Sequence, residues 1–172
     1  FEIGEPEAIM VLDVNEAPAS LAGPPDPRVE QVESVAGLGA VQNIAEAVWA
    51  EDYTWLIREL SEEMTQPDYL SVYVARVEGT PASCAWIRFH DGTDFVSLWG
   101  GSTLERYRGR GLYTALLATR IAEARRRGFR YVTVDASPMS RPILQRHGFE
   151  VLTWAWACEW HFRDHGDGQE LP

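Results

Sequence analysis

The chain has 172 residues, of which 45% are hydrophobic and seven are tryptophan, so it is long enough to bury a sizeable core and lacks the composition of a disordered protein. Its formal net charge is −11 and it contains no lysine, which argues against nucleic acid and acidic membranes as partners. No segment has the run of about 20 apolar residues that a membrane-spanning helix needs, and no signal peptide is recognisable.

Runs of apolar residues separated by turn signals predict strands and helices in the order β-α-α-β-β-β-α-β-α-β. The expected elements are a strand at 8–14, a loop at 17–27, a helix at 29–50 interrupted at 37–39, a helix at 54–64, a hairpin of strands at 69–76 and 82–90, a strand at 95–99, a helix at 112–127, a strand at 131–136, a helix at 138–147 and a long strand at 150–162. We expect one domain over residues 1–163 and a polar tail at 164–172.

The connection after the strand at 95–99 carries two closely spaced glycines among arginines, Arg108-Gly109-Arg110-Gly111. The next helix has one apolar face, which is formed by Leu112, Leu116, Leu117, Ile121 and Ala124. The loop therefore opens onto a helix N-terminus, where free N–H groups and the helix dipole favour an anion. Glycine also lets a phosphate approach the backbone closely.

Two common phosphate-binding loops do not fit this pattern. A P-loop ends in Gly-Lys-Ser/Thr, and the chain has no lysine. A dinucleotide-binding fingerprint needs three glycines and an acidic residue about 20 positions further on. Here the loop has two glycines, and Asp135 lies at the far end of the next strand.

The loop resembles the acetyl-CoA loop of the GCN5-related N-acetyltransferase (GNAT) family, whose pattern is Arg/Gln-x-x-Gly-x-Gly/Ala. Two registers fit. The register 106–111 satisfies every fixed position, whereas the register 108–113 matches the Arg-Gly-Lys-Gly run common in the family. We favour the second register because the helical periodicity begins at Gly111 and Leu112.

The segment from Ser137 to Phe149 resembles the fourth helix of the same family, which closes in Gly-Phe. Ser137 is the expected N-cap, Pro138 the first helical position and Gly148 the stop. Many family members have a tyrosine four residues before this glycine, where it protonates the departing CoA thiolate. In this chain that position is Leu144.

The resemblance covers about residues 49–149 and implies an α/β GNAT fold, with a mixed, mostly antiparallel sheet splayed between strands four and five and about four flanking helices. It implies an acetyl-CoA-dependent N-acetyltransferase that acts on a primary amine of a small molecule or peptide. Because of Leu144, the alternative is a non-catalytic acyl-CoA-binding or regulatory module on the same fold. The residues expected to bind the cofactor are Gly101, Ser102, Thr103, Arg108, Gly109, Arg110, Gly111, Leu112, Tyr113 and Ser137.

The residue that removes the amine proton is left open between two carboxylates. Asp94 precedes strand four, near where some relatives carry a glutamate base, although it also fits a turn residue. Asp135 ends strand five beside the expected split, although it also fits a cap of the next helix. His90 and a chain of water molecules are further alternatives. No metal site is expected.

Charge and sequence pattern suggest the surroundings of the site. Residues 1–100 hold four arginines and 18 acidic residues, whereas residues 101–172 hold 11 arginines and eight acidic residues. The second half therefore suits CoA phosphates, and the first half suits a cationic amine.

Two cysteines, Cys84 and Cys158, are expected to be reduced core residues of a cytoplasmic protein. Trp154, Trp156, Cys158 and Trp160 share one strand face, which is expected to pack on the fourth helix at Trp154 and which also fits a homodimer face or a wall of the acceptor pocket.

Overall fold

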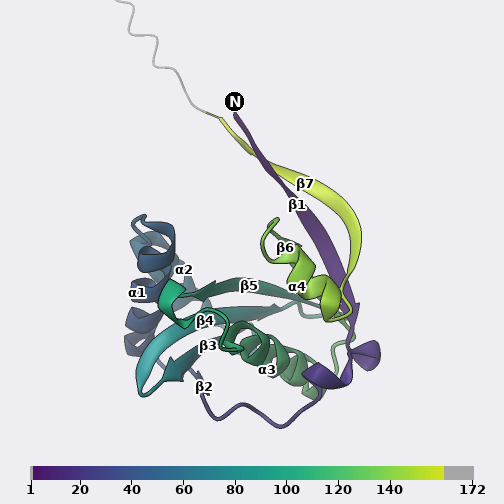
Figure 1. Cartoon of the computed structure of the whole chain (residues 1–172), viewed down its shortest axis with the longest axis horizontal. Helices are drawn as coiled ribbons and strands as arrows, with labels where there is room; N and C mark the ends of the chain where they lie inside the picture. Colours follow the sequence, from purple (N-terminus) through teal and green to yellow (C-terminus); the bar gives the residue numbers. More distant parts are fainter. Residues whose placement is uncertain (1, 161–172) are drawn as a thin grey trace, which may run out of the picture.

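The computed structural model describes residues 2–160, so the expected tail at 164–172 lies outside the described residues. Seven strands form one mixed sheet in the order β2-β3-β4-β5-β6-β1-β7 (Figure 1). The strands are β1 (Glu2–Asp13), β2 (Val29–Gln31), β3 (Leu70–Val77), β4 (Thr80–Phe89), β5 (Phe95–Thr103), β6 (Tyr131–Ala136) and β7 (Glu150–Glu159). The helices are α1 (Leu38–Trp49), α2 (Thr54–Glu63), α3 (Leu112–Arg126) and α4 (Arg141–Arg146). Four short 3-10 turns are added to them: η1 (Val14–Glu16), η2 (Ala19–Leu21), η3 (Val35–Gly37) and η4 (Glu105–Tyr107). The α/β fold with a mixed sheet and four helices is the one expected.

Two hydrophobic cores lie on opposite faces of the sheet. The first is formed by α3 and α4 with inward residues of β1, β4, β5 and β6, and it includes Leu112, Leu116 and Leu144. The second is formed by α1 and α2 with β3 and β4, and it includes Ile44, Leu60 and Trp86. Because side chains alternate along a strand, successive residues of β3 and β4 contribute to different cores.

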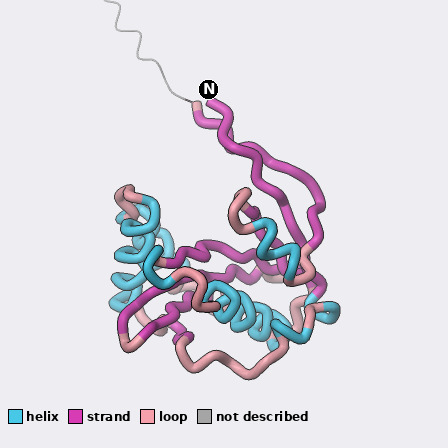
Figure 2. The backbone as a smooth tube through the Cα atoms, viewed as in Figure 1, coloured by secondary structure: helices cyan, strands magenta, loops and turns pink. Residues whose placement is uncertain are grey.

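The N-terminal strand lies far from the strands that follow it in the sequence. β1 is hydrogen-bonded between β6 and β7 and is antiparallel to both, with Ala8 opposite Ala136 on one side and Trp154 on the other. The chain then crosses the molecule through residues 14–28 to reach β2 at the opposite edge of the sheet (Figure 2). The strand inserted beside β6 therefore comes from the start of the chain.

The expected helix at 29–50 is wrong in its first third. Residues 29–31 form the edge strand β2, in which Val29 pairs with Ala75 and Gln31 with Tyr73. A salt bridge of 2.5 Å between Glu30 and Arg76 joins the same two strands. Pairing with β3 overrides the helical pattern here, and the α-helix begins only at Leu38.

The strands β1 and β7 form a two-stranded ribbon that rises beside α4 and runs past the rest of the molecule (Figure 1). β7 is the edge of the sheet, and Trp154, Trp156 and Cys158 are exposed along it. The expectation that Cys158 is a core residue is therefore wrong. Trp154, which was expected to pack in the core against the fourth helix, is 42% exposed, so that expectation is wrong as well, although the guanidinium of Arg141 on that helix lies 5.0 Å from the centre of its ring. Within residues 2–160, none of the helices is both long and apolar enough to cross a membrane.

Candidate functional site

The central strands β5 and β6 separate at their carboxyl ends. They are parallel and paired from Phe95–Tyr131 to Leu98–Val134, and the pairing stops there. Beyond this point β5 continues to Thr103 beside β4, while β6 continues to Ala136 beside β1. The expected split between strands four and five therefore lies between β5 and β6, and the loop to α3 begins on the same side of it. In open α/β sheets, ligands bind at such crevices beyond the carboxyl ends of the strands.

The loop into α3 has the backbone of an anion-binding turn. Gly109 and Gly111 have φ angles of 73° and 75°, in the left-handed region that favours glycine, and Gly111 is the residue that precedes the helix. No heavy atom lies within 4 Å of the position that a Cβ would take at either glycine. Within the described residues, the N–H groups of residues 109–114 make no backbone hydrogen bond. The first turn of α3 thus presents free donors beside open space.

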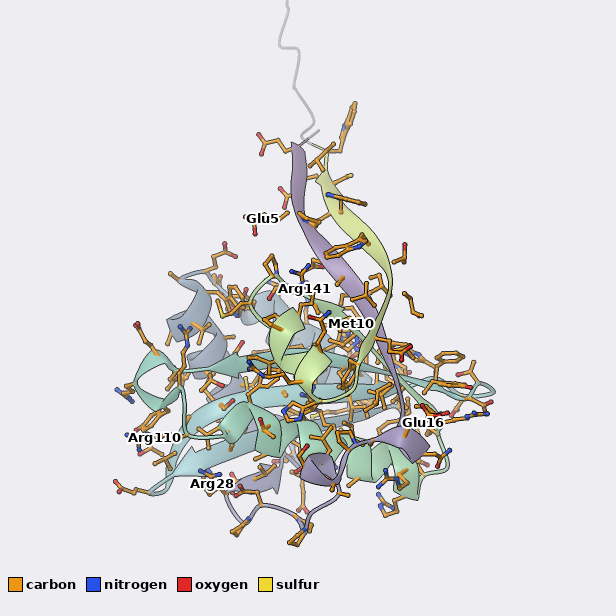
Figure 3. The ribbon with its side chains drawn as sticks, turned by 45° about the vertical axis from the view of Figure 1, so that its right-hand side comes forward. Glu5, Met10, Glu16, Arg28, Arg110 and Arg141 are labelled. Carbon is orange, nitrogen blue, oxygen red and sulfur yellow. The ribbon has the colours of Figure 1, made fainter. Side chains whose placement is uncertain are left out.

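Arginine side chains surround this turn and leave its backbone N–H groups free. The guanidinium groups of Arg106 and Arg110 lie 5.0 and 5.4 Å from the ring centre of Tyr107. Arg108 donates from Nε to the Thr103 carbonyl at 3.3 Å. Arg28 donates to the Arg110 carbonyl at 3.1 Å, and these two arginines lie near each other in Figure 3. Their combined positive charge favours a polyanion at the loop.

At the split, β5 contains a two-glycine bulge. Gly100 and Gly101 both have positive φ angles, 73° and 78°, and the register with β4 shifts by one residue between Cys84 and Ala85. A Cβ at Gly100 would lie 2.3 Å from Cζ3 of Trp86, and one at Gly101 would lie 3.0 Å from the ring of Tyr113. Aromatic rings therefore fill the space beside both glycines, and only glycine fits at Gly100.

A buried arginine lies beneath the bulge. Arg120 on α3 is 2% exposed, and it donates from Nη1 to the carbonyls of Trp86 at 3.1 Å and Trp99 at 3.2 Å. Its Nε donates to the Leu116 carbonyl one turn earlier in the helix. Burial lowers the pKa of Arg120 to about 10, so its guanidinium is still charged at neutral pH. Burial also raises the pKa of the neighbouring Cys84 thiol to about 12 and raises that of Tyr113.

Beside the split, the face of β5 opposite α3 carries polar and aromatic groups. Trp99, 43% exposed, stacks against the guanidinium of Arg88 at 4.8 Å and donates from Nε1 to Ser97 Oγ at 2.8 Å. Ser97 Oγ also lies 2.9 Å from Nε2 of His90. Arg88 is held in turn by Glu59 and Glu63 of α2, at 2.7 and 2.9 Å. These contacts fix Trp99 on the face of β5 opposite α3.

The two carboxylates considered as bases occupy different places. Asp135 is exposed on β6, one residue beyond the last pair with β5, and it faces away from the core that contains Val132 and Ala136. It therefore lies beside the split, on the same face as Trp99. Asp94 precedes β5, and its carbonyl accepts from the N–H groups of Arg130 and Tyr131. Six residues of extended strand, about 20 Å, separate Asp94 from Gly100, so the structure does not bring Asp94 together with the loop.

Several other expected cofactor residues have side chains that are already engaged. Ser102 Oγ accepts from Trp49 Nε1 at 3.0 Å, and Thr103 Oγ1 lies 2.7 Å from Ser83 Oγ. Leu112 is 1% exposed in the core beneath the loop. Leu112 therefore has only backbone groups to offer a ligand, and both hydroxyl groups are already oriented by a protein partner.

The fourth helix begins later than expected. Ser137 Oγ accepts from the Ser140 N–H at 3.3 Å, so it caps a turn that precedes the helix, and the helix itself starts at Arg141. Pro142 occupies the early position expected for Pro138. Leu144 is fully buried against the α3 core and does not line the split.

Sequence reasoning missed three side chains that the structure places at the split. The resemblance places the backbone of Trp99 at the start of the segment 99–103, where donors to the developing oxyanion are expected, but the sequence does not single out the side chains of Trp99, Ser97 and Arg120. Arg120 carries one signal, because a charged residue between Leu116 and Ile121 interrupts an otherwise apolar helical face.

A pocket of about 510 Å³ lies on the other side of the loop, where Ile44, Pro81 and Arg106 line it, and it does not reach the split. Among the described residues, no cluster of His, Cys, Asp or Glu could hold a metal ion.

Comparisons with known proteins agree with this fold. The sequence model of the acetyltransferase (GNAT) family matches residues 40–149, which is more than half of the chain. No curated protein matches the sequence. Solved structures that are similar have low sequence identity, so they show the fold alone.

Three solved structures illustrate the likeness. A GNAT-family protein from Novosphingobium aromaticivorans DSM 12444 has 20% identity and a TM-score of 0.63, over 90% of this chain and 62% of its own. AAC(6')-Iy in complex with the bisubstrate analogue CoA-S-monomethyl-acetylneamine has 22% identity and a TM-score of 0.59, over 78% of this chain and 96% of its own. The ribosomal-protein-S18-alanine N-acetyltransferase from Escherichia coli has 19% identity and a TM-score of 0.56, over 69% and 73%. The chain thus spans less than two thirds of the first of these proteins.

Proposed function

The chain belongs to the acetyltransferase (GNAT) family, and on that premise we propose that it transfers an acetyl group from acetyl-CoA to a primary amine. The observation that carries the proposal is the open, glycine-lined first turn of α3 beside the split of β5 and β6. A phosphate loop and a gap in the sheet are the two features that a phosphorylated thioester cosubstrate needs. The likeness to AAC(6')-Iy, solved with a CoA conjugate, supports the same cosubstrate.

The loop fits the pyrophosphate of CoA. Gly109 and Gly111 leave room for phosphate oxygens, and the free N–H groups of residues 109–114 supply donors. Arg108, Arg110 and the N-terminus of α3 add positive charge, while Tyr113 and Leu112 hold the turn against the sheet. Backbone groups of Gly101, Ser102 and Thr103, together with Ser137 across the split, complete the proposed cofactor site.

The chemistry proposed for the split is direct attack of the amine on the thioester. A C–N bond forms, the C–S bond breaks, the thiolate departs, and the amine loses one proton. Backbone N–H groups at the Gly100–Gly101 bulge are placed to stabilise the negative charge that develops on the carbonyl oxygen. Departure of the thiolate needs no strong acid, because the pKa of a thiol is about 8.5.

We propose Asp135 as the group that accepts the amine proton, because it is the carboxylate beside the split on the face of Trp99. The variant Asp135→Asn removes the base and retains the shape of the side chain. Asp94→Asn makes the same change at the other end of β5. A fall of about 10²-fold or more in kcat for Asp135→Asn alone supports this role, within the range for general bases. If Asp94→Asn has the larger effect, the assignment is reversed.

The acceptor is proposed to be a small-molecule or peptide amine. The similar solved structures include proteins named for an aminoglycoside and for a ribosomal-protein alanine, so the fold itself does not select between these classes. The exposed indole of Trp99 and the carboxylate of Asp135 line the face that an amine would approach. An aromatic ring and a carboxylate both favour a cationic group.

The proposed activity is tested by release of the CoA thiol from acetyl-CoA, measured with a panel of amino acids, polyamines, aminoglycosides and N-terminal peptides. Release that depends on both an amine and the intact loop supports transfer. If acetyl-CoA binds and no amine raises thiol release above the rate without acceptor, the alternative of a non-catalytic acyl-CoA-binding module is the correct one.

Two further properties belong to this proposal. A cytoplasmic location is supported by the two free thiols, Cys84 and Cys158. A homodimer through the edge of β7 is supported by the row of exposed residues that includes Trp154 and Trp156. Sedimentation equilibrium of the wild type and of Trp156→Ser tests the dimer, which predicts a larger mass for the wild type.

A further inference from the structure

Arg120 is a buried cation without a carboxylate partner in the part of the chain that the structure describes. By contrast, Arg126 at the end of α3 and Arg127, which follows it, form salt bridges with Glu123. Arg120 instead directs its guanidinium at three backbone carbonyls, those of Leu116, Trp86 and Trp99. Burying a charge without a carboxylate partner is costly. A role in holding these carbonyl groups in place would explain why the charge is buried there.

The contact with Trp99 fixes one particular peptide group. The described chain has no cis peptide bond, so the N–H of Gly100 points in the direction opposite to the Trp99 carbonyl. That carbonyl is directed at Arg120, which also binds the Trp86 carbonyl on β4. The His90 N–H donates to the Phe95 carbonyl, so by the alternation of an antiparallel pair the residues Trp86 and Trp99 also turn their backbone groups toward each other. The Trp99 carbonyl therefore faces β4, and the Gly100 N–H faces away from it, toward the side of β5 on which β6 has separated.

The bulge has fewer backbone constraints than the strand on either side of it, because Gly101 is skipped in the pairing of β5 with β4. Gly100 and Gly101 both have positive φ angles and no side chains, and paired glycines have wide conformational freedom. The ring of Trp86 limits Gly100 on one side of the sheet, and Tyr113 limits Gly101 on the other. Neither ring makes a hydrogen bond that would set the direction of a peptide group, whereas Arg120 does.

We propose that Arg120 is a positioning residue for acetyl transfer, which holds the Trp99–Gly100 peptide so that the Gly100 N–H donates to the thioester carbonyl oxygen. The inference rests on the proposed function, because it assumes that acetyl-CoA is bound at the split. The charge of Arg120 acts in the same sense as this peptide dipole. Both stabilise negative charge on the carbonyl oxygen.

The test is the infrared stretching frequency of the carbonyl of acetyl-CoA labelled with ¹³C in the acetyl group. A hydrogen bond to the oxygen lowers this frequency, so wild-type protein is expected to shift it below that of free acetyl-CoA. Arg120→Met, which has a similar apolar stem and no donor, is expected to lose most of the shift and about 10²-fold in kcat, as when an oxyanion donor is removed. The Kd for CoA is expected to stay within threefold.

The matched control is Arg126→Met, on the same helix with its side chain 71% exposed. It should retain both the carbonyl shift and kcat. An Arg120 with a purely structural role would instead lower the unfolding temperature and leave the carbonyl frequency of the folded protein unchanged. Retention of the full shift by folded Arg120→Met overturns the proposal.

A second measurement needs no variant and covers the case in which Arg120→Met does not fold. In ¹⁵N-labelled wild-type protein, the amide proton of Gly100 should move further downfield with acetyl-CoA than with CoA. An equal response to the two ligands overturns the proposal. If the wild type binds acetyl-CoA with a carbonyl shift that folded Arg120→Met loses, and no amine is acetylated, the transferase function is wrong while the part of the proposal in which Arg120 holds the peptide that binds the thioester carbonyl stands. If the protein does not bind acetyl-CoA, both the proposed transferase function and the proposed role of Arg120 are wrong.

Discussion

The six-membered ring of Trp86 lies against Gly100, where an added Cβ would be 2.3 Å from Cζ3 of the indole. Trp86 is 93% buried between the sheet and the helices α1 and α2, so the ring cannot easily move aside. Its Nε1 has no hydrogen-bond partner among the described residues, which is an unusual cost for a buried donor. The bulge of β5 is therefore shaped by a close contact that only glycine permits.

Replacing Gly100 by alanine is expected to disturb both the bulge and the activity. The methyl group meets the Trp86 ring, and the φ angle of 73° is unfavourable for alanine, so we expect a loss of roughly 1–3 kcal/mol in the free energy of unfolding. The loss should exceed that of Gly92→Ala, whose φ is also 73° but whose Cβ would meet no atom within 4 Å. Urea unfolding of both variants and their kcat values check this. Equal losses would show that the Trp86 contact is unimportant.

The sequence predicted the elements that carry the site better than it predicted their neighbours. The parallel unit β5-α3-β6 follows from an apolar strand, a glycine turn and a periodic helix, all of which are local signals. The pairing of β1 with β6 and β7 joins segments more than 100 residues apart, and no local pattern encodes it. The strand β2 was missed for a related reason, since its three residues become a strand only by pairing with β3.

Within the site, the sequence identified backbone features and missed contacts between distant side chains. Gly109 and Gly111 mark the loop because their positive φ angles require glycine. The contact of Arg120 with the carbonyls of β4 and β5, and that of Trp99 with Arg88, depend on the assembled sheet. A residue such as Arg120 is recognisable in the sequence as an exception to the apolar pattern, but its partners are not.

Leu144→Tyr is expected to weaken the fold without increasing the rate. Leu144 is fully buried with Leu112 and Phe149, so a phenol there must overpack the core and bury its hydroxyl group. We expect a loss of roughly 1–3 kcal/mol in the free energy of unfolding. Leu144→Met, which conserves volume, should cost less than about 1.5 kcal/mol. A folded Leu144→Tyr enzyme with a higher kcat than the wild type would show that this position reaches the thiolate after all.

The two free cysteines should differ in reactivity. Cys84 is 1% exposed, and burial raises the pKa of its thiol to about 12, so its reactive thiolate is almost absent at pH 8. Cys158 is exposed on β7. Alkylation of the native protein at pH 8, read by peptide mass spectrometry, should modify Cys158 quickly and Cys84 only after denaturation. Rapid modification of Cys84 in the native protein would contradict its burial against Arg120.

His147 should make the fold sensitive to mild acid. Its Nε2 lies 3.4 Å from Thr114 Oγ1 of α3, and its Nδ1 lies 3.4 Å from Ser20 Oγ. Burial, and then the charge of Arg146, lower the pKa of His147 below its ordinary value of 6.5. The unfolded chain therefore takes up a proton more readily than the folded one, so this stabilisation is present above about pH 6.5 and is lost as the pH falls through the lowered pKa.

The measurement for this effect is the thermal midpoint at pH 7.5 and at pH 5.5. The wild type should lose more on acidification than His147→Gln, which cannot take up the proton. The carboxylates whose pKa values are lowered, such as Asp13 and Asp26, titrate below their ordinary value of 3.8 and contribute little in this range. An equal loss in the two proteins would assign the acid sensitivity to other groups.

The central claim is that acetyl-CoA is held at the first turn of α3, and calorimetric titration of acetyl-CoA tests it most directly. Gly111→Asp places a side chain and a negative charge in the open space beside the free N–H groups, whereas Gly128→Asp makes the same change at a positive-φ glycine beyond the other end of α3. The two variants share the backbone strain, so any difference between them reports on the loop. We predict binding by the wild type and Gly128→Asp and a loss of several kcal/mol for Gly111→Asp, enough to abolish micromolar binding. Equal affinity of all three proteins would contradict the claim.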